Sequence, residues 1–238
     1  MNPSDGVTSN RTTGDSRGRE GVRFPLCFLD RLRMATDGTG MTALVGAYGC
    51  PLQCKWCINP QTWRAGTAFT WVTPTQLYEQ VKQDHLYYLA TGGGVTFGGG
   101  EPLSHAPFIT AFRALCPAPW HLCAETSLYV PADFVETAAG AVDCFFVDIK
   151  DTDPAVYRAY TGQDNRPVLD NLALLLSLVG PDRVTVRLPL IPGFNTEAHR
   201  SRSEARLREM GVTRFDRLTY RIKSTGRGGD GSATNKVE

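Results

Sequence analysis

Three cysteines, Cys50, Cys54 and Cys57, follow one another in the spacing C-x3-C-x2-C. Three thiolates on so short a loop can converge on a single metal centre. A [4Fe–4S] cluster is usually held by four cysteines, and no fourth cysteine lies close by in the sequence. One iron would therefore keep an open coordination position, which indicates chemistry rather than storage or simple electron transfer.

Two other uses of cysteine fit this loop less well. A structural zinc site normally needs four Cys or His ligands, typically in two separated pairs, and the histidines all lie far from the loop. A disulfide framework is typical of short secreted chains with an even cysteine count, whereas this chain has 7 cysteines. Residues 58–98 contain no cysteine, so the sequence predicts one cluster.

A glycine-rich segment, Gly98-Gly99-Gly100-Glu101, follows an apolar run at residues 95–97. Glycine permits close backbone approaches that a side chain would block. The amino group of a ligand could therefore meet backbone carbonyls here, together with the Glu101 carboxylate. The alternative is an ordinary glycine-rich turn after a strand, and the position downstream of the cysteine loop favours the binding role.

Charged and hydroxyl side chains end two further apolar runs. Glu125 and Thr126 close one of them, and Asp148 and Lys150 close the other. Acidic groups at neighbouring strand ends can bind a cation or the hydroxyls of a ribose. The alternative is a solvated Asp–Lys pair of little energetic value, which the apolar residues around the pair disfavour.

Arg187 stands inside an apolar run, and burying its charge alone would be costly. Its fork of donors matches a carboxylate, so its partner is either a ligand carboxylate or a protein one, Asp148 or Glu125. Asn59 directly follows the cysteine loop and precedes Pro60. Asn59 is interpreted either as a turn residue or as a hydrogen-bonding contact to a ligand.

The elements that must position these residues are strands alternating with helices. Near-continuously apolar strands separated by helices indicate a parallel sheet with right-handed crossovers. Catalytic residues of such folds gather at the carboxyl ends of the strands, where these motifs stand. Strands are predicted at residues 42–47, 94–97, 120–125, 142–150, 183–188 and 217–222, and helices at 74–89, 107–115, 132–138, 165–178 and 196–210.

A chain of 238 residues with a net charge of +1 fits one domain and gives no global sign of binding to nucleic acid or to an anionic membrane. No run approaches the ~18 apolar residues of a membrane span, and no export signal begins the chain. Composition predicts a disordered arm at 1–22, a folded domain at 23–223 and a disordered tail at 224–238. The remaining cysteines are interpreted as small, separate apolar residues in a reducing cytoplasm: Cys27, Cys116, Cys123 and Cys144.

Four segments together resemble the radical S-adenosylmethionine (SAM) enzymes. They are residues 49–57 (GCPLQCKWC, with Trp56 in the aromatic place before the third cysteine), 95–103 (VTFGGGEPL), 147–150 (VDIK) and 190–195 (LIPGFN). Within that superfamily the chain is most similar to the activating enzymes of glycyl-radical enzymes, such as the pyruvate formate-lyase activase. The resemblance runs from about residue 43 to residue 220. It implies an α/β fold, the partial (β/α)6 barrel of the radical SAM type.

The resemblance also implies a cofactor set. It consists of one [4Fe–4S] cluster on Cys50, Cys54 and Cys57, SAM on the open iron, and a small monovalent cation held by Glu125, Thr126 and Asp148. Lys150 would be catalytic, facing the SAM carboxylate or the substrate. The implied cofactor-binding residues are Trp56, Asn59, Gly99, Gly100, Glu101, Glu125, Thr126, Asp148 and Arg187.

The implied reaction begins when a donor such as flavodoxin or ferredoxin reduces the cluster. SAM is then cleaved to methionine and a 5′-deoxyadenosyl radical, which abstracts hydrogen from a glycine of a partner glycyl-radical enzyme. Two departures from the family pattern lie at residues 18–41, before the cysteine loop, and after Lys223. They keep two alternatives open: an enzyme that modifies a small molecule or peptide in natural-product biosynthesis, and, outside this class, a non-catalytic metal-binding module.

Overall fold

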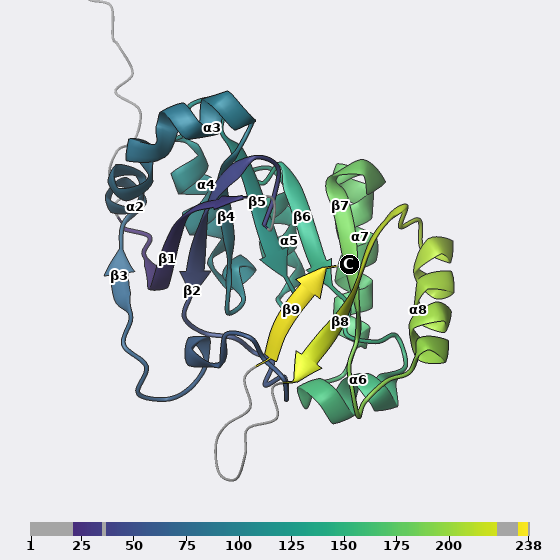
Figure 1. Ribbon diagram of the computed structural model, residues 1–238. Coiled ribbons are helices and arrows are strands. Elements are labelled where there is room, and N and C mark those ends of the chain that lie inside the picture. Colours follow the sequence, from purple (N-terminus) through teal and green to yellow (C-terminus); the bar gives the residue numbers. More distant parts are fainter. Residues whose placement is uncertain (1–20, 35–36, 223–232, 238) are drawn as a thin grey trace, which may run out of the picture.

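A nine-stranded sheet runs through the computed structural model, which describes residues 21–34, 37–222 and 233–237. Six neighbouring strands are parallel and are joined by helical crossovers (Figure 1), as the sequence predicts for a partial (β/α)6 barrel. These strands are β2 (Met41–Ala47), β4 (Gly94–Gly99), β5 (His121–Thr126), β6 (Cys144–Asp148), β7 (Val184–Leu190) and β8 (Arg214–Ile222).

The helices agree with the predicted ones except at two places. They are α2 (Pro74–Val81), α3 (His85–Thr91), α4 (Ala106–Arg113), α5 (Ala132–Ala139), α6 (Pro154–Thr161), α7 (Arg166–Val179) and α8 (Glu197–Glu209). The single helix predicted at 74–89 is interrupted by a 3-10 turn at Lys82–Asp84. The turn places the buried carboxylate of Asp84 2.6 Å from the guanidinium of Arg31.

Helix α6 is absent from the sequence prediction, although its boundary signals are present. The Asp153 side chain caps the helix by accepting hydrogen bonds from the backbone amides of Ala155 and Val156, and Pro154 takes the first helical position. Gly162 ends the helix in the left-handed conformation, with φ of 81°. This short helix matters because its last residues contact the cysteine loop.

Three antiparallel strands extend the parallel set at its two sides. β1 (Phe24–Met34) pairs with β2 and with β3 (Thr70–Val72), in a region where the sequence predicts no element. β9 (Ala233–Val237) pairs with β8. Composition predicts disorder for 224–238, and the structure instead places five of those residues in a strand, because β8 offers its backbone donors and acceptors at the sheet edge. Of the arm predicted at 1–22, residues 1–20 lie outside the described residues.

The two faces of the parallel strands have opposite character. One face carries Phe97 and its neighbours against the helices, with the Phe97 ring 5.4 Å from that of Phe112 in α4. Side chains alternate between faces along a strand, so Glu125, Asp148 and Arg187 point to the other face. This alternation explains how ionic residues can stand inside runs of buried apolar ones.

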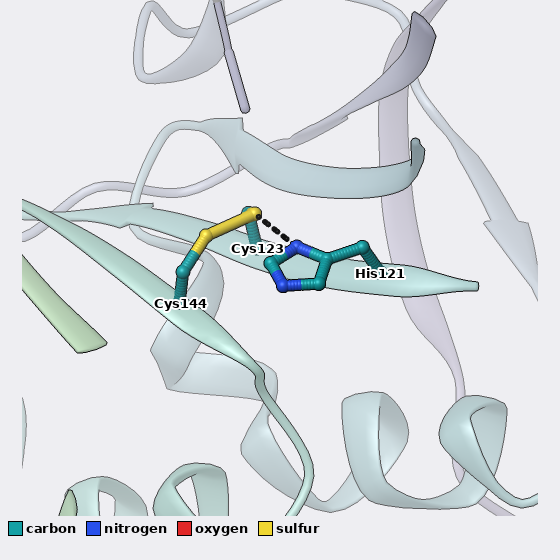
Figure 2. Close-up of side chains that lie close together, drawn as sticks. All are labelled: His121, Cys123 and Cys144. Atoms are coloured by element: carbon teal, nitrogen blue, oxygen red, sulfur yellow. Dashed lines mark hydrogen bonds between the residues drawn. A yellow bond between two sulfur atoms is a disulfide. The ribbon is translucent and has the colours of Figure 1, made fainter. Parts of the chain in front are cut away.

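Two cysteines of the barrel do not behave as isolated apolar residues. Cys123 and Cys144 are register partners on β5 and β6, and their sulfur atoms form a disulfide (Figure 2). The prediction that both are separate thiols is therefore wrong, because only the strand register brings them together. Cys27 and Cys116 are free and half-buried. Among the described residues, no helix is both long and apolar enough to cross a bilayer.

Candidate active site

The cysteine loop begins directly after β2 and is held in place through its backbone. The amide of Gly49 donates to the carbonyl of Thr62 at 2.6 Å. The amides of Gln53 and Lys55 donate to the last two carbonyls of α6, those of Thr161 and Tyr160, at 3.3 and 3.1 Å. The loop is thus fixed between the ends of β2 and α6.

The thiols of Cys50, Cys54 and Cys57 line one cavity at the carboxyl ends of the strands, and none of the three is in a disulfide. Burial raises the pKa of Cys50 to about 12 and that of Cys54 to about 11. Bound iron would offset the free-energy cost of deprotonating these buried thiols, because metal binding stabilises the thiolate. Three free thiols on one cavity wall fit the three protein ligands of a site-open cluster.

The glycine segment forms the neighbouring wall and touches the cysteine loop backbone to backbone. Gly99 has φ of 88°, a conformation that favours glycine. A Cβ atom on Gly100 would lie 2.1 Å from the carbonyl oxygen of Gly49, which no real side chain permits. The amides of Gly100 and Glu101 donate to the carbonyls of Ala47 and Gly49. Glycine is therefore required where the two segments meet.

Glu101 is fully buried, and it does not line the cavity. Its carboxylate accepts hydrogen bonds from the Thr126 hydroxyl at 2.6 Å and from the amide and hydroxyl of Ser127 at 2.8 and 2.5 Å. Burial raises the pKa of Glu101, and these hydrogen bonds oppose the rise. The structure thus differs from the sequence assignment of Glu101 to a ligand amino group: its oxygens join the end of β4 to the end of β5.

Arg187 is the centre of an ionic network on the cavity side of the sheet. Its Nη1 atom lies 2.7 Å from Oε1 of Glu125, and its Nε atom lies 3.5 Å from the carboxylate of Asp216. The guanidinium also lies over the Phe146 ring, 4.7 Å from its centroid. Burial raises the pKa of Glu125, against the lowering effect of Arg187. Of the two protein partners considered from sequence, the structure selects Glu125.

Lys150 forms a second ionic group beside the first. Its Nζ atom lies 3.1 Å from the carboxylate of Asp148 and donates to the hydroxyl of Tyr220 at 2.9 Å. Burial, the largest single effect, lowers the pKa of Lys150, but the combined attraction to Asp148 and to the other groups around Lys150 holds that pKa well above its usual value. Lys150 is therefore a buried, permanently charged group at the cavity wall.

Trp56 and Asn59 also line the cavity. The indole Nε1 of Trp56 is buried and has no hydrogen-bond partner among the described residues, so it can donate to a ligand. Asn59 starts the 3-10 turn Pro60–Thr62, and its carbonyl accepts from the amide and hydroxyl of Thr62. Asn59 therefore acts as a turn residue through its backbone carbonyl, and the residue also lines the cavity.

Sequence reasoning missed several wall residues. Ser127 directly follows a motif residue and could have been found by extending that motif. Tyr160 was hidden because α6 was not predicted, and Tyr220 because its interior position depends on the register of β8. The residues that the structure brings to this one cavity are Cys50, Leu52, Cys54, Trp56, Cys57, Ile58, Asn59, Gly99, Gly100, Glu125, Thr126, Ser127, Asp148, Lys150, Tyr160, Arg187 and Tyr220.

The family match and the similar proteins point to the same superfamily. The sequence pattern of the Radical SAM superfamily matches residues 44–201. The isethionate sulfite-lyase activating enzyme of Nitratidesulfovibrio vulgaris is 27% identical over an alignment of 246 positions, which covers 77% of this chain and 80% of that enzyme. The pyruvate formate-lyase-activating enzyme of Staphylococcus aureus is 31% identical over 168 positions, covering 68% of this chain and 66% of that enzyme.

A solved structure shows the same fold at greater distance. SuiB of Streptococcus suis superposes with a TM-score of 0.58 and 13% identity, covering 82% of this chain and 41% of SuiB. Identity at this level is evidence for the shared barrel alone.

Proposed function

The chain belongs to the radical SAM superfamily and is a radical SAM enzyme; we propose that it activates a partner glycyl-radical enzyme by removing a hydrogen atom from one of that partner's glycines. The observation that carries the proposal is the cavity itself, where three free thiols meet the glycine segment and a wall of ionic side chains. The relatives that align along most of the chain carry the names of activating enzymes.

Cys50, Cys54 and Cys57 would hold the cluster. Bound together, a [4Fe–4S] cluster and SAM supply a one-electron cleavage of SAM to methionine and a 5′-deoxyadenosyl radical. Three protein thiolates leave one iron of four without a protein ligand, which is the place for SAM. The chain's own part is binding, orientation and exclusion of water.

The ionic wall suits the charges of SAM. The backbone carbonyls of Gly99 and Gly100 can approach the amino group closely, since no side chain intervenes. Arg187 and Lys150 are the two buried cations that could meet the carboxylate. Arg187 would exchange its present partner, Glu125, for that carboxylate, and Glu125 would become available to the ribose hydroxyls.

The aromatic side chains Tyr160 and Tyr220 would shield the reacting atoms. Their ring centroids are 6.4 Å apart, and both rings line the cavity next to Lys150. A primary carbon radical abstracts the nearest hydrogen atom of suitable bond strength, so the cavity wall must hold the target C–H group closer to the radical than any competing group. We assign these two residues to substrate positioning and to water exclusion.

A small monovalent cation beside SAM is a further part of the proposal. Its support is the gathering of Glu125, Thr126 and Asp148 on one cavity wall. Arg187 and Lys150 now hold the two carboxylates, so a cation would have to compete with them. SAM cleavage measured in potassium, in sodium and in an organic cation would test this, and equal rates in all three would remove the cation from the site.

We also propose a flavodoxin- or ferredoxin-type electron donor and a cytoplasmic location. The proposed cluster needs an electron donor and is destroyed by oxygen. A reducing compartment such as the cytoplasm provides electrons and limits oxidation. The electron-donor assignment is tested by measuring SAM cleavage with purified flavodoxin or ferredoxin and, in parallel, with a chemical reductant in its place.

The central experiment uses cluster-loaded protein under anaerobic conditions with a reductant, SAM and a candidate glycyl-radical enzyme. A stable radical signal on the partner polypeptide is expected by electron paramagnetic resonance. Deuterium placed on the target glycine should appear in 5′-deoxyadenosine. Label arriving only from a small molecule or a short peptide would contradict glycine activation and would leave the radical SAM assignment intact.

A further inference from the structure

A second set of metal-binding side chains lies at the other end of the barrel strands. His121 and Cys123 stand at the start of β5, and Cys144 is the first residue of β6. The active site occupies the opposite, carboxyl ends of the same strands. In Figure 2 the imidazole of His121 and the two sulfur atoms point toward one another, and Nδ1 of His121 lies 3.4 Å from Sγ of Cys123.

We propose that His121, Cys123 and Cys144 form a second metal site, which binds one zinc ion when the disulfide is reduced. Two thiolates and an imidazole are the ligands that zinc prefers, at about 2.3 Å for sulfur and about 2.0–2.1 Å for nitrogen. The three ligand atoms already lie within 4.8 Å of one another.

The surroundings suit a small ion. Cys123 is 1% exposed, and the two thiolates would cancel the charge of the ion, so the buried centre stays neutral. Gly38 packs close to the site: a Cβ atom there would lie only 3.3 Å from both Sγ of Cys123 and Cγ2 of Thr42. The Thr42 hydroxyl is buried without a hydrogen-bond partner among the described residues. A water in the fourth zinc position would give that hydroxyl a partner.

The two states of the site are linked by a balanced reaction. A trialkylphosphine and water reduce the S–S bond by two electrons, and the phosphine becomes its oxide. In the presence of Zn²⁺ both sulfurs leave the reaction as zinc-bound thiolates, and two protons are released. The disulfide is thus the oxidised form, and the zinc complex is the form expected under the reducing conditions in which the proposed cluster survives.

The ion would brace the strands that carry the active site. Alternation along the strands places Cys123 on the same face as Glu125, and Cys144 on the same face as Asp148. A metal bridge between β5 and β6 therefore fixes the spacing of the strands below those two carboxylates. The test of this site does not depend on SAM cleavage.

The experiment uses anaerobic, cluster-loaded protein treated with a trialkylphosphine and then with zinc. Iron and zinc are counted by mass spectrometry, and zinc-edge X-ray absorption identifies the zinc ligands without interference from iron. We expect one zinc per chain with two sulfur neighbours and one histidine. Cys144→Ser should lose the zinc and keep the iron, and His121→Ala should bind zinc at least ten-fold more weakly. Cys116→Ser, which changes a cysteine outside the site, should behave as wild type.

A measurement on the unaltered protein covers the case in which a variant fails to fold. Zinc should slow alkylation of Cys123 and Cys144 in the reduced protein by at least ten-fold, as read by peptide mass spectrometry. Unchanged alkylation, zinc retained by Cys144→Ser, or a disulfide that resists the phosphine in the folded protein would each overturn the proposal. The iron count, recorded in the same samples, separates any of these outcomes from a failure of the cluster assignment.

Discussion

At the scale of single residues, the motif residues fall into two groups: those whose side chains face the cavity, and those that hold the cavity wall together from behind. The three cysteines have free sulfur atoms on the cavity wall, whereas Glu101, from a motif expected to bind a ligand, is enclosed by Thr126 and Ser127. Arg187 lies between these categories, because it faces the cavity and already has a protein carboxylate as partner.

Replacing Cys54 with Ala should abolish both the brown cluster absorbance and SAM cleavage. The protein supplies only three thiolates at this cavity, so losing one leaves too few anchors for a stable cluster. Absorbance, iron content and the yield of 5′-deoxyadenosine measure the result. Cys116→Ser is the matched control and should keep all three, while an active Cys54→Ala enzyme would be incompatible with the assigned cluster site.

Replacing Arg187 with Lys should weaken SAM binding by about ten-fold, which corresponds to ~1.4 kcal/mol. The charge is kept, but the planar fork that matches a carboxylate is lost. Equilibrium binding to cluster-loaded protein gives the affinity, and thermal unfolding gives the stability. Unchanged affinity with a large loss of stability would mean that Arg187 serves the Glu125 ion pair alone.

At the scale of elements, the site depends on two contacts made by the end of β4, one with the cysteine loop and one with the end of β5. The end of β4 meets the cysteine loop through glycine backbone contacts, and it meets the end of β5 through the Glu101 carboxylate. Both junctions lie beside the cavity, so a change in either should displace cofactor-binding groups without touching them chemically.

Gly100→Ala should reduce the iron content of the protein. The new Cβ atom would overlap the Gly49 carbonyl, which lies 2.1 Å from its ideal position, so the cysteine loop must move. The matched control is Gly140→Ala at the end of α5, where the nearest atom is 3.9 Å away and φ is −80°. If both variants hold the same iron as the wild type, the close contact does not position the loop.

Glu101→Gln should destabilise the protein by roughly 1–3 kcal/mol, the usual cost of leaving buried polar groups unsatisfied. The groups around the Glu101 carboxylate are hydrogen-bond donors, and the amide of Gln would turn another donor toward them. Urea unfolding of the two proteins measures the difference. A variant as stable as the wild type would show that the β4–β5 junction tolerates an uncharged side chain.

At the scale of the whole molecule, the parallel barrel is extended by antiparallel strands on both sides. β1 and β3 extend it beside β2, and β9 extends it beside β8. The ends of such a sheet are open to pairing with other chains unless they are covered. β8 also carries Tyr220, so its cover by β9 lies next to the active-site wall.

A protein ending at Ile222 should keep its cluster and SAM cleavage, and it should aggregate more readily. The cavity residues in the described part of the chain all precede that point, whereas the edge of β8 would lose its β9 partner. Iron content and 5′-deoxyadenosine yield test the first expectation, and light scattering on warming tests the second. Loss of the cluster in this shortened protein would place part of the folded domain after residue 223.

The sequence by itself determined the features that depend on neighbouring residues. The spacing of Cys50, Cys54 and Cys57 predicted one metal centre, and the apolar runs predicted all six parallel strands. These features are local, because a short loop must bring its thiols together and a buried strand must be apolar on its covered face. The cavity's composition followed from them, since parallel strands present their carboxyl ends at one edge.

Only the tertiary structure decided which side chains become partners across the sheet. Arg187 pairs with Glu125, and the Glu101 carboxylate bonds to Thr126 and Ser127. Cys123 meets Cys144 because β5 and β6 place the two residues in register. A shift of one residue in the pairing of a strand would send all the side chains of that strand to the opposite face of the sheet. No pattern within a single strand carries that register, so the ionic wall and the second cysteine pair appear only when the strands are assembled.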